Sequence, residues 1–251
     1  MIDLHSHILH GVDDGAATVE DGVEMARSAV ADGVTVIAAT PHVRGDYPTT
    51  AETMELRLAE LREALAAAGV ELQVLAGGEL DLQRLAELPD DELRCFGLGG
   101  NASVLLLEFP YHGWPLGLAD TVFGLRTRGF RPVIAHPERS AEVQARPEQL
   151  APIVEGGALV QLTAASVDGR LGRRPRDAAF RLLELGLAHL LASDAHAPSI
   201  RQIGMSSAAE AIGDPALARW LTVEVPAAIV GGEHIPARPP APRRRRFGWV
   251  R

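Results

Sequence analysis

The chain contains no lysine, and all 24 of its basic residues are arginines. Without lysine, the protein forms no lysine Schiff base and carries no phosphate-binding lysine of the P-loop type. Its single cysteine, Cys95, excludes an internal disulfide and a cysteine-rich zinc module. We therefore expect a protein of a reducing compartment, the cytoplasm, in which Cys95 is a small buried side chain.

The sequence also lacks long apolar runs, and residues 1–236 carry no excess of basic residues. No segment reaches the roughly 18 apolar residues that cross a bilayer, and the opening MIDLHSH has no features of a signal peptide. The net charge is −9, but residues 237–251 carry six arginines and no acid, which leaves 18 arginines against 33 acidic residues on residues 1–236. An acidic body is a poor electrostatic match for nucleic acid, so we expect no nucleic-acid partner.

Short apolar segments alternate with helical patterns along the first 236 residues. Gly33, for example, follows a helical segment that begins after a capping Thr18. Continuous apolar strands separated by helices indicate a parallel α/β sheet that is covered on both faces. Seven such strands favour a single-domain (β/α)7 barrel over an open doubly wound sheet; the segments are MIDLHSH, VTVIAATPH, VELQVLAGGEL, SVLLLEFP, RPVIAHPER, ALVQLTAAS and HLLASDAH.

The C-terminal segment differs from the rest of the chain. Four prolines and no apolar period follow Ile235, so we expect one domain over residues 1–236 and a flexible Pro/Arg-rich tail over 237–251. The arginine run predicts at most a weak contact with an anionic surface, and a solvated end without a partner is the alternative.

Metal-binding residue types stand at the carboxyl ends of six of the seven segments. Parallel barrels gather their active-site residues at these ends, so the side chains are expected to form one shared metal site. His-x-His and Asp-x-His place both ligands on one face of a strand. Imidazole with carboxylate, and no thiolate, suits manganese, zinc or iron, and the number of ligands requires two or three ions. The candidates are His5, His7, Asp14, His42, Glu79, Glu108, His136, Asp194 and His196. Asp13 is expected to bind no metal itself but to orient one of these ligands.

Seven motifs resemble, in order, the metallophosphatases of the PHP superfamily: HSHILHGVDDG, ATPH, GGEL, LLLEFP, PVIAHPER, QLTAASVDGRLGR and LASDAH. The most similar members are protein-tyrosine phosphatases of bacterial capsule and exopolysaccharide operons. This resemblance implies a distorted TIM-like PHP barrel with a trinuclear centre, and manganese as the expected ion. One ion takes His5, His7, Glu79 and Asp194; Glu79 bridges to a second, held also by Glu108 and His136; the third takes Asp14, His42 and His196.

The resemblance also implies a reaction. Arg139 and Arg201 hold the phosphate, and a metal-bridging hydroxide attacks phosphorus in line. The implied substrate is phosphotyrosine on a tyrosine autokinase that controls polysaccharide export. His112 is a candidate proton donor, and Tyr111 and Trp114 on the same loop either pack against the substrate ring or brace a turn. The alternatives are a PHP phosphatase for a small metabolite such as histidinol phosphate, another phosphoesterase, and a non-catalytic scaffold with a structural metal site.

Overall fold

The computed structural model describes residues 1–197 and 202–240. Arg201 and residues 241–251 of the predicted tail lie outside the described residues. Within these ranges the chain forms nine strands: β1 (Ile2–Ser6), β2 (Val36–Ala39), β3 (His42–Val43), β4 (Gln73–Leu75), β5 (Glu79–Leu80), β6 (Val104–Glu108), β7 (Arg131–Ala135), β8 (Leu159–Thr163) and β9 (Leu190–Ala192).

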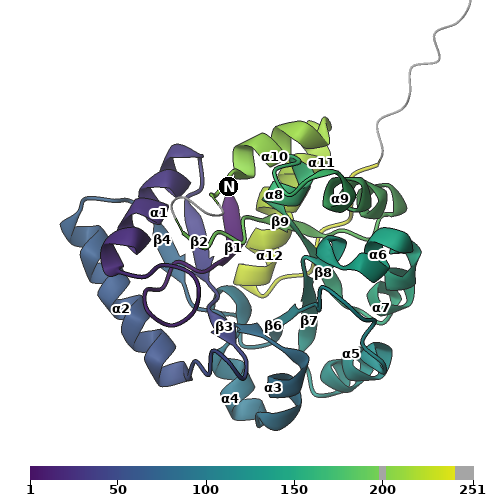
Figure 1. The fold of residues 1–251 in the computed structure, drawn as a ribbon, viewed down its shortest axis with the longest axis horizontal. Helices are drawn as coiled ribbons and strands as arrows, with labels where there is room; N and C mark the ends of the chain where they lie inside the picture. Colours follow the sequence, from purple (N-terminus) through teal and green to yellow (C-terminus); the bar gives the residue numbers. More distant parts are fainter. Residues whose placement is uncertain (198–201, 241–251) are drawn as a thin grey trace, which may run out of the picture.

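Helices connect these strands and surround them (Figure 1). The α-helices of the described residues are α1 (Val19–Ala31), α2 (Ala51–Ala67), α3 (Leu82–Glu87), α4 (Asp90–Cys95), α5 (Leu118–Thr127), α6 (Ala141–Ala145), α7 (Ala151–Glu155), α8 (Ala164–Val167), α9 (Arg173–Leu185), α10 (Met205–Ile212), α11 (Pro215–Arg219) and α12 (Val225–Gly231). Short 3₁₀ turns are η1 (Leu98–Gly100), η2 (Pro137–Arg139) and η3 (Pro147–Leu150), and a π-helical turn, η4 (Trp220–Glu224), joins α11 to α12.

Two of the predicted strands are each interrupted once. The second divides into β2 and β3 around Pro41, which has no N–H to donate to a neighbouring strand. The third divides into β4 and β5 around Gly77 and Gly78. A side chain at Gly78 would have its Cβ 2.7 Å from the ring of Phe96, so the close approach requires glycine. Seven predicted strand positions therefore contain nine strands.

All strand pairs are parallel, which confirms the predicted α/β class. The strand orders are β1-β2-β4 and β3-β5-β6-β7-β8-β9. Beyond β9, the N–H of Asp194 donates to the carbonyl of His5 and the N–H of His7 donates to the carbonyl of Ala195, both at 2.8 Å. These bonds bring the end of the last strand beside the first, and the strands lie around a common centre, with most helices outside and α12 near the middle of the view (Figure 1).

The first helix has the N-terminal cap that the sequence predicts. The hydroxyl of Thr18 accepts a hydrogen bond from the N–H of Asp21, and the carboxylate of Asp21 accepts one from the N–H of Thr18. This reciprocal pair satisfies two backbone donors that would otherwise be unpaired at the start of α1. Gly33, with a φ of 84°, follows the helix in the left-handed region.

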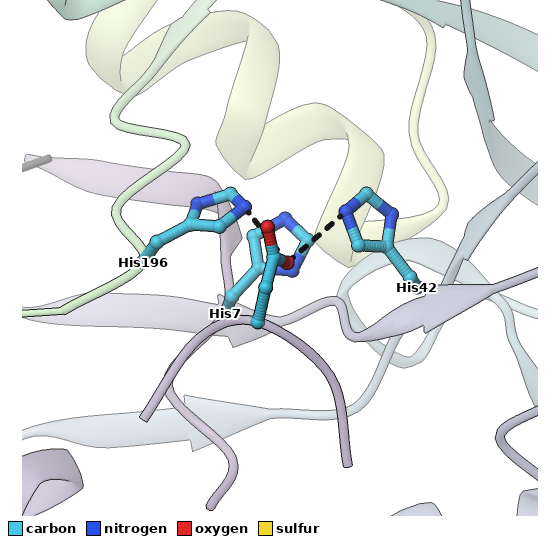
Figure 2. Close-up of side chains that lie close together, drawn as sticks. His7, His42 and His196 are labelled. Carbon is cyan, nitrogen blue, oxygen red and sulfur yellow. Dashed lines mark ion pairs between the residues drawn. The ribbon is translucent and has the colours of Figure 1, made fainter. Parts of the chain in front are cut away.

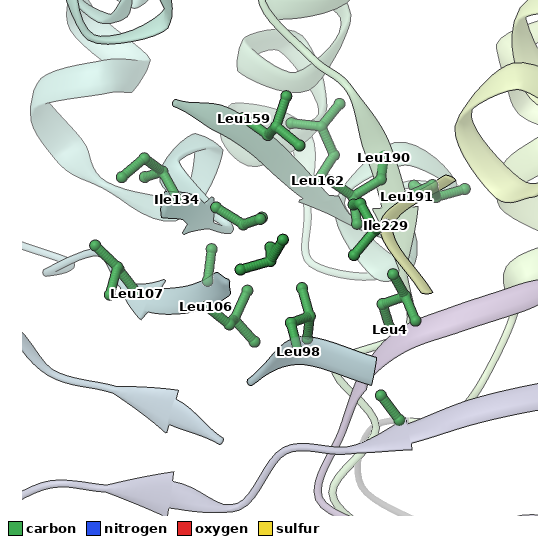
Figure 3. Packing of buried hydrophobic residues seen from close by; sticks show 14 of the residues in the cluster. Leu4, Leu98, Leu106, Leu107, Ile134, Leu159, Leu162, Leu190, Leu191 and Ile229 are labelled. Atoms are coloured by element: carbon green, nitrogen blue, oxygen red, sulfur yellow. The ribbon is translucent and has the colours of Figure 1, made fainter. Parts of the chain in front are cut away.

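Buried leucine and isoleucine side chains from the strands fill the molecule, together with residues of η1 and α12. Each fully buried aliphatic side chain contributes about 1.5–3 kcal/mol through removal of apolar surface from water, so this core holds the strand ends in fixed positions. Figure 3 shows ten of them close together: Leu4, Leu98, Leu106, Leu107, Ile134, Leu159, Leu162, Leu190, Leu191 and Ile229.

Two sequence-based expectations concern the surface. Cys95 is exposed at the end of α4, so the expectation that it is buried was wrong. Its Sγ lies 3.4 Å from the carbonyl of Asp91, one helical turn earlier, which directs it along the helix surface and not into the core. Among the described residues, no helix is both long and apolar enough to span a bilayer.

Candidate metal centre

The nine predicted metal ligands converge at the carboxyl ends of the strands. They form four overlapping groups, in each of which one ligand atom per residue lies within 4.8 Å of the others. Neighbouring groups share His5, His7, His42 or Glu79. The groups are His5–His7–Asp194, His5–Glu79–His136, His42–Glu79–Glu108 and His7–Asp14–His42–His196.

Two ligands adopt unusual backbone conformations. His136 and Asp194 are the non-glycine residues with positive φ in the described ranges, at 37° and 52°. His136 directly follows β7, and Asp194 lies two residues after β9. The left-handed conformation redirects the chain at each of these points. Such conformations cost about 1–3 kcal/mol each and persist at functional sites where the surroundings hold them.

Glu79 lies at the centre of the cluster and is fully buried. Its Oε1 is 2.8 Å from Nε2 of His136, and its Oε2 is 2.9 Å from Nδ1 of His42 and 3.4 Å from Nε2 of His5. Burial acts to raise the pKa of Glu79, but the charge of His5 and the hydrogen bonds of the surrounding imidazoles hold it well below its usual range. The carboxylate is therefore ionised, and its two oxygens face different histidines, as a bridging ligand requires.

Asp14 reaches the cluster from the loop after β1. Its Oδ1 is 3.5 Å from Nε2 of His42 and 3.4 Å from Nε2 of His196. Figure 2 shows His7, His42 and His196 pointing toward one another, with these two ion pairs dashed. The Asp14 side chain is 44% exposed, while the three imidazoles are buried. This group therefore lies where the cluster opens to solvent.

Asp13 hydrogen-bonds to the predicted ligand His7, in agreement with the expectation from the sequence. Its Oδ2 is 2.7 Å from Nδ1 of His7 and accepts a hydrogen bond from the N–H of His42, while Oδ1 accepts one from Gly15. Burial acts to raise the pKa of Asp13, but His7 and these backbone donors lower it to about 2. The ionised Asp13 holds the Nδ1 proton of His7 and leaves Nε2 to face the cluster.

The donor set fits divalent cations. His196 directs Nδ1 at the carbonyl of Asp194, 3.0 Å away, so its Nε2 also faces inward. Nε2 of His5 and Nε2 of His7 are only 3.2 Å apart. When Nδ1 of each ring carries the proton, both Nε2 lone pairs face this space, which suits a cation between them. Buried imidazoles with carboxylates are the ligand set of zinc, manganese and non-haem iron.

Arg44 is a residue of the site that sequence reasoning missed. Its Nη1 donates to both oxygens of Glu108, at 2.9 and 3.2 Å, and its Nε pairs with Asp46 at 2.8 Å. Its guanidinium also lies 5.1 Å from the ring centre of Tyr47, which stacks on His42. Glu108 lies with His42 and Glu79 in one of the four groups, and its assignment to the same ion as His136 stays a prediction. An arginine two residues after a ligand gives no sequence signal of this contact.

Arg139 lies at the edge of the cluster and Arg201 lies outside the described residues. Nη1 of Arg139 is 2.5 Å from Oδ2 of Asp194. The guanidinium lies 4.7 Å from the ring centre of Tyr111, which stacks on His136 at 5.8 Å. Arg139 therefore combines a buried carboxylate contact with an aromatic contact at the rim.

The loop after β6 divides into a rim part and a bracing part. Trp114 packs edge-on against Phe109, with ring centres 5.7 Å apart, and so braces the loop. Tyr111 is 39% exposed and stacks on His136, so it belongs to the rim of the cluster. His112 is exposed, and no contact in the described part of the chain joins it to the cluster.

Comparison with known proteins assigns the family. A family model described as "Capsular polysaccharide synthesis, CpsB/CapC" matches residues 1–218. The tyrosine-protein phosphatase YwqE of Bacillus subtilis is 33% identical over 99% of this chain and 100% of its own length. The putative tyrosine-protein phosphatase CapC of Staphylococcus aureus is 34% identical over 78% of this chain and 77% of its own.

Solved structures give the same assignment. A crystal structure from work on YwqE of Bacillus subtilis and CpsB of Streptococcus pneumoniae, called unique metal-dependent tyrosine phosphatases, matches with a TM-score of 0.86 and 32% identity. It covers 96% of this chain and 98% of that chain. A probable 2-pyrone-4,6-dicarboxylic acid hydrolase of Acinetobacter baumannii, with a TM-score of 0.54 and 16% identity over 92% of this chain and 98% of that chain, shares the fold alone. The chain therefore belongs to the CpsB/CapC family of capsular polysaccharide synthesis proteins.

Proposed function

We propose that this protein is a metal-dependent protein-tyrosine phosphatase that acts on a phosphorylated bacterial tyrosine kinase of capsule or exopolysaccharide synthesis. The observation that carries the proposal is the convergence of nine imidazole and carboxylate ligands beside the guanidinium of Arg139. A structural metal site is normally closed and needs no group that binds phosphate. Relatives named as tyrosine-protein phosphatases, similar over most of the chain, support the same activity.

The centre holds two or three divalent ions, with manganese as the proposed metal and zinc or iron as alternatives. Glu79 would be the ligand shared by two ions, because its Oε1 faces His136 and its Oε2 faces His42. When bound, the ions supply an activated water and positive charge for the phosphoryl oxygens. The cluster carboxylates and inward-facing imidazoles provide the ligands, and the buried strand ends keep them in place.

The residues around the cluster bind and orient the phosphate ester. Arg139 offers a planar guanidinium for two phosphate oxygens, a geometry that an ammonium group lacks. Arg201 is the proposed second phosphate-binding arginine, on the sequence resemblance. Tyr111 lies beside Arg139 and is placed to contact the tyrosyl ring. His112 is the proposed proton donor to the leaving phenolate, although a leaving group with a pKa of about 10 needs little assistance.

A substrate panel tests the proposal. Purified protein, stripped of metal and reloaded with Mn²⁺, is assayed on a phosphotyrosyl peptide, a phosphoseryl peptide and histidinol phosphate. We expect kcat/KM for the phosphotyrosyl peptide to exceed that for either other substrate by at least tenfold. Equal or faster hydrolysis of histidinol phosphate would favour the small-metabolite phosphatase. His112→Ala tests the proton donor, and a loss in kcat that is larger for poor leaving groups is the expected signature.

The kinase partner and cellular location are parts of the same proposal. A family of capsular polysaccharide synthesis and a single cysteine fit an enzyme that works in the cytoplasm on a kinase of the export machinery. The phosphorylated tyrosine-rich segment of such a kinase should be dephosphorylated by the Mn²⁺-loaded protein. The arginine tail, a proposed weak contact with an anionic surface, is tested by vesicle co-sedimentation with and without residues 241–251.

A further inference from the structure

A buried glutamine connects two ligand-bearing parts of the cluster. Gln161 lies on β8, between β7 and β9, and β8 carries none of the predicted ligands. Its side chain is fully buried. Oε1 of Gln161 lies 3.1 Å from Nδ1 of His5 and accepts a 3.2 Å hydrogen bond from the backbone N–H of His136.

These two contacts fix the protonation of His5. A backbone N–H can only donate, so the amide atom that faces His136 is the oxygen. The same oxygen faces Nδ1 of His5 and can only accept, so Nδ1 is the ring nitrogen that carries a proton and donates to it. This arrangement leaves Nε2 of His5 to bind a metal ion, and Nε2 faces the cluster, 3.2 Å from Nε2 of His7 and 3.4 Å from Oε2 of Glu79.

The same amide oxygen also contacts the strained turn at His136. That residue has a φ of 37°, and its N–H needs an acceptor because it is buried. Gln161 supplies the acceptor, and its backbone is held in register with Ala135, the preceding residue. One side chain thereby positions an imidazole from β1 and the turn after β7.

Charge explains why a neutral amide suits this position. His7 is supported by the carboxylate of Asp13, while the cluster already contains four further carboxylates: Asp14, Glu79, Glu108 and Asp194. A second supporting carboxylate behind His5 would add negative charge to a buried, crowded site. An amide oxygen accepts the same hydrogen bonds without that charge.

We propose that Gln161 is a positioning residue of the metal centre, which selects the Nδ1-protonated form of His5 and holds the turn at His136. The inference rests on the metal binding in the proposed function and is independent of the substrate. Residues that orient metal-bound histidines typically change metal affinity 10–100-fold when they are replaced. Gln161→Leu is the test variant, because leucine keeps most of the volume and removes both polar atoms.

The test measures metal binding and histidine protonation without substrate. Full-length wild type, Gln161→Leu, Gln161→Glu and the control Gln149→Leu are titrated with Mn²⁺ against a chromophoric chelator, and circular dichroism checks folding. Gln149 is likewise hydrogen-bonded to the backbone, since its Nε2 donates to the carbonyls of Glu142 and Arg146, but none of these partners is a predicted ligand. We expect Mn²⁺ affinity to fall 10–100-fold in Gln161→Leu and by less in Gln161→Glu, which keeps the acceptor, while Gln149→Leu matches wild type.

Nuclear magnetic resonance of ¹⁵N-histidine protein loaded with Zn²⁺ gives a second readout. Wild type should show a protected Nδ1–H of His5 that is missing from Gln161→Leu and retained in Gln161→Glu. A folded Gln161→Leu with wild-type Mn²⁺ affinity would overturn the inference. If that variant does not fold, an Nε2-protonated His5 in wild type overturns it equally. A wild type that binds Mn²⁺ but does not hydrolyse phosphotyrosine would refute the proposed substrate and leave this inference standing.

Discussion

Nη1 of Arg139 lies 2.5 Å from Oδ2 of Asp194, which joins the turn after β7 to the residues that follow β9. Burial acts to lower the pKa of Arg139, but the charge of Asp194 raises it above the usual value. The guanidinium therefore stays charged while only 16% of the side chain is exposed. This fixed positive charge beside a predicted metal ligand is what the proposed phosphate-binding role of Arg139 requires.

Arg139→Ala should lower kcat/KM for a phosphotyrosyl peptide by about 100–1000-fold, the usual loss for one group that stabilises transition-state charge. Arg139→Lys should restore only part of this, because lysine keeps the charge but not the planar fork. Metal content, measured by mass spectrometry, should stay unchanged. Arg146→Ala, at an exposed position after α6, is the control. Activity of Arg139→Ala within threefold of wild type would contradict the assigned role.

Arg44→Ala should raise KM for the phosphotyrosyl peptide about tenfold and change kcat by less than threefold. The guanidinium contacts Glu108 and Tyr47 at the rim, so its positive charge attracts the dianionic ester without lying on the reacting atoms. Steady-state kinetics at two ionic strengths measure the effect, which should shrink in high salt. Arg27→Ala, which removes only a hydrogen bond to the carbonyl of Ala68, should leave both constants unchanged. An unchanged KM in Arg44→Ala would show that the positive charge of Arg44 does not contribute to substrate binding.

His136→Ala should lose at least one metal equivalent and nearly all phosphatase activity, because Nε2 of this residue faces the central Glu79 at 2.8 Å. Circular dichroism should show that the fold is retained, since the apolar core remains intact. The exposed His234 provides the control substitution His234→Ala. A fully active, fully metallated His136→Ala would argue against the proposed centre.

The stability of the fold should fall at mildly acidic pH through His189, which is remote from the cluster. Burial first, and then the charges of Arg238 and Arg131, lower the pKa of His189 to about 4. The unfolded chain, with a histidine pKa near 6.5, binds more protons, so stability is complete above pH 6.5 and is lost as the pH falls toward 4. The loss between pH 7.5 and 5 is about 2 kcal/mol.

Urea unfolding of the metal-free protein at pH 7.5 and 5 measures this effect. His189→Gln should reduce the pH dependence of the unfolding free energy by that amount, whereas His234→Gln should not. Equal pH dependence in wild type and His189→Gln would contradict the assignment to His189.

The ligands could be predicted from sequence because two regular features coincide. Each candidate follows a short apolar segment, and parallel strands bring their carboxyl ends together, so Glu79 and His196 are expected to meet although they are far apart in the chain. Every predicted ligand lies in the cluster. The assignment of each ligand to a particular ion depends on side-chain directions, which strand order alone does not specify, and it stays a prediction.

Other features of the site could not be predicted from the sequence, because they depend on contacts between residues far apart in the chain. Gln161 ends no strand and reads as an ordinary polar residue within an apolar segment; its role depends on contacts with His5 and His136 from other strands. Arg44 is recognisable only once β3 and β6 place it against Glu108. The interruption between β4 and β5 arises from the close approach of Phe96 to Gly78, a tertiary contact that leaves no local pattern.

The hydrogen bonds between His5 and Asp194 and between His7 and Ala195 have a consequence for biosynthesis. The cluster needs residues from both ends of a stretch of nearly two hundred, so a nascent chain released only as far as β8 has an incomplete coordination sphere. Tight loading with metal must then wait until the last ligands leave the ribosome and dock beside the first strand. If the cluster binds metal as proposed, we expect metal capture to be a late event in the maturation of this protein, at the seam where the first strand meets the residues after β9.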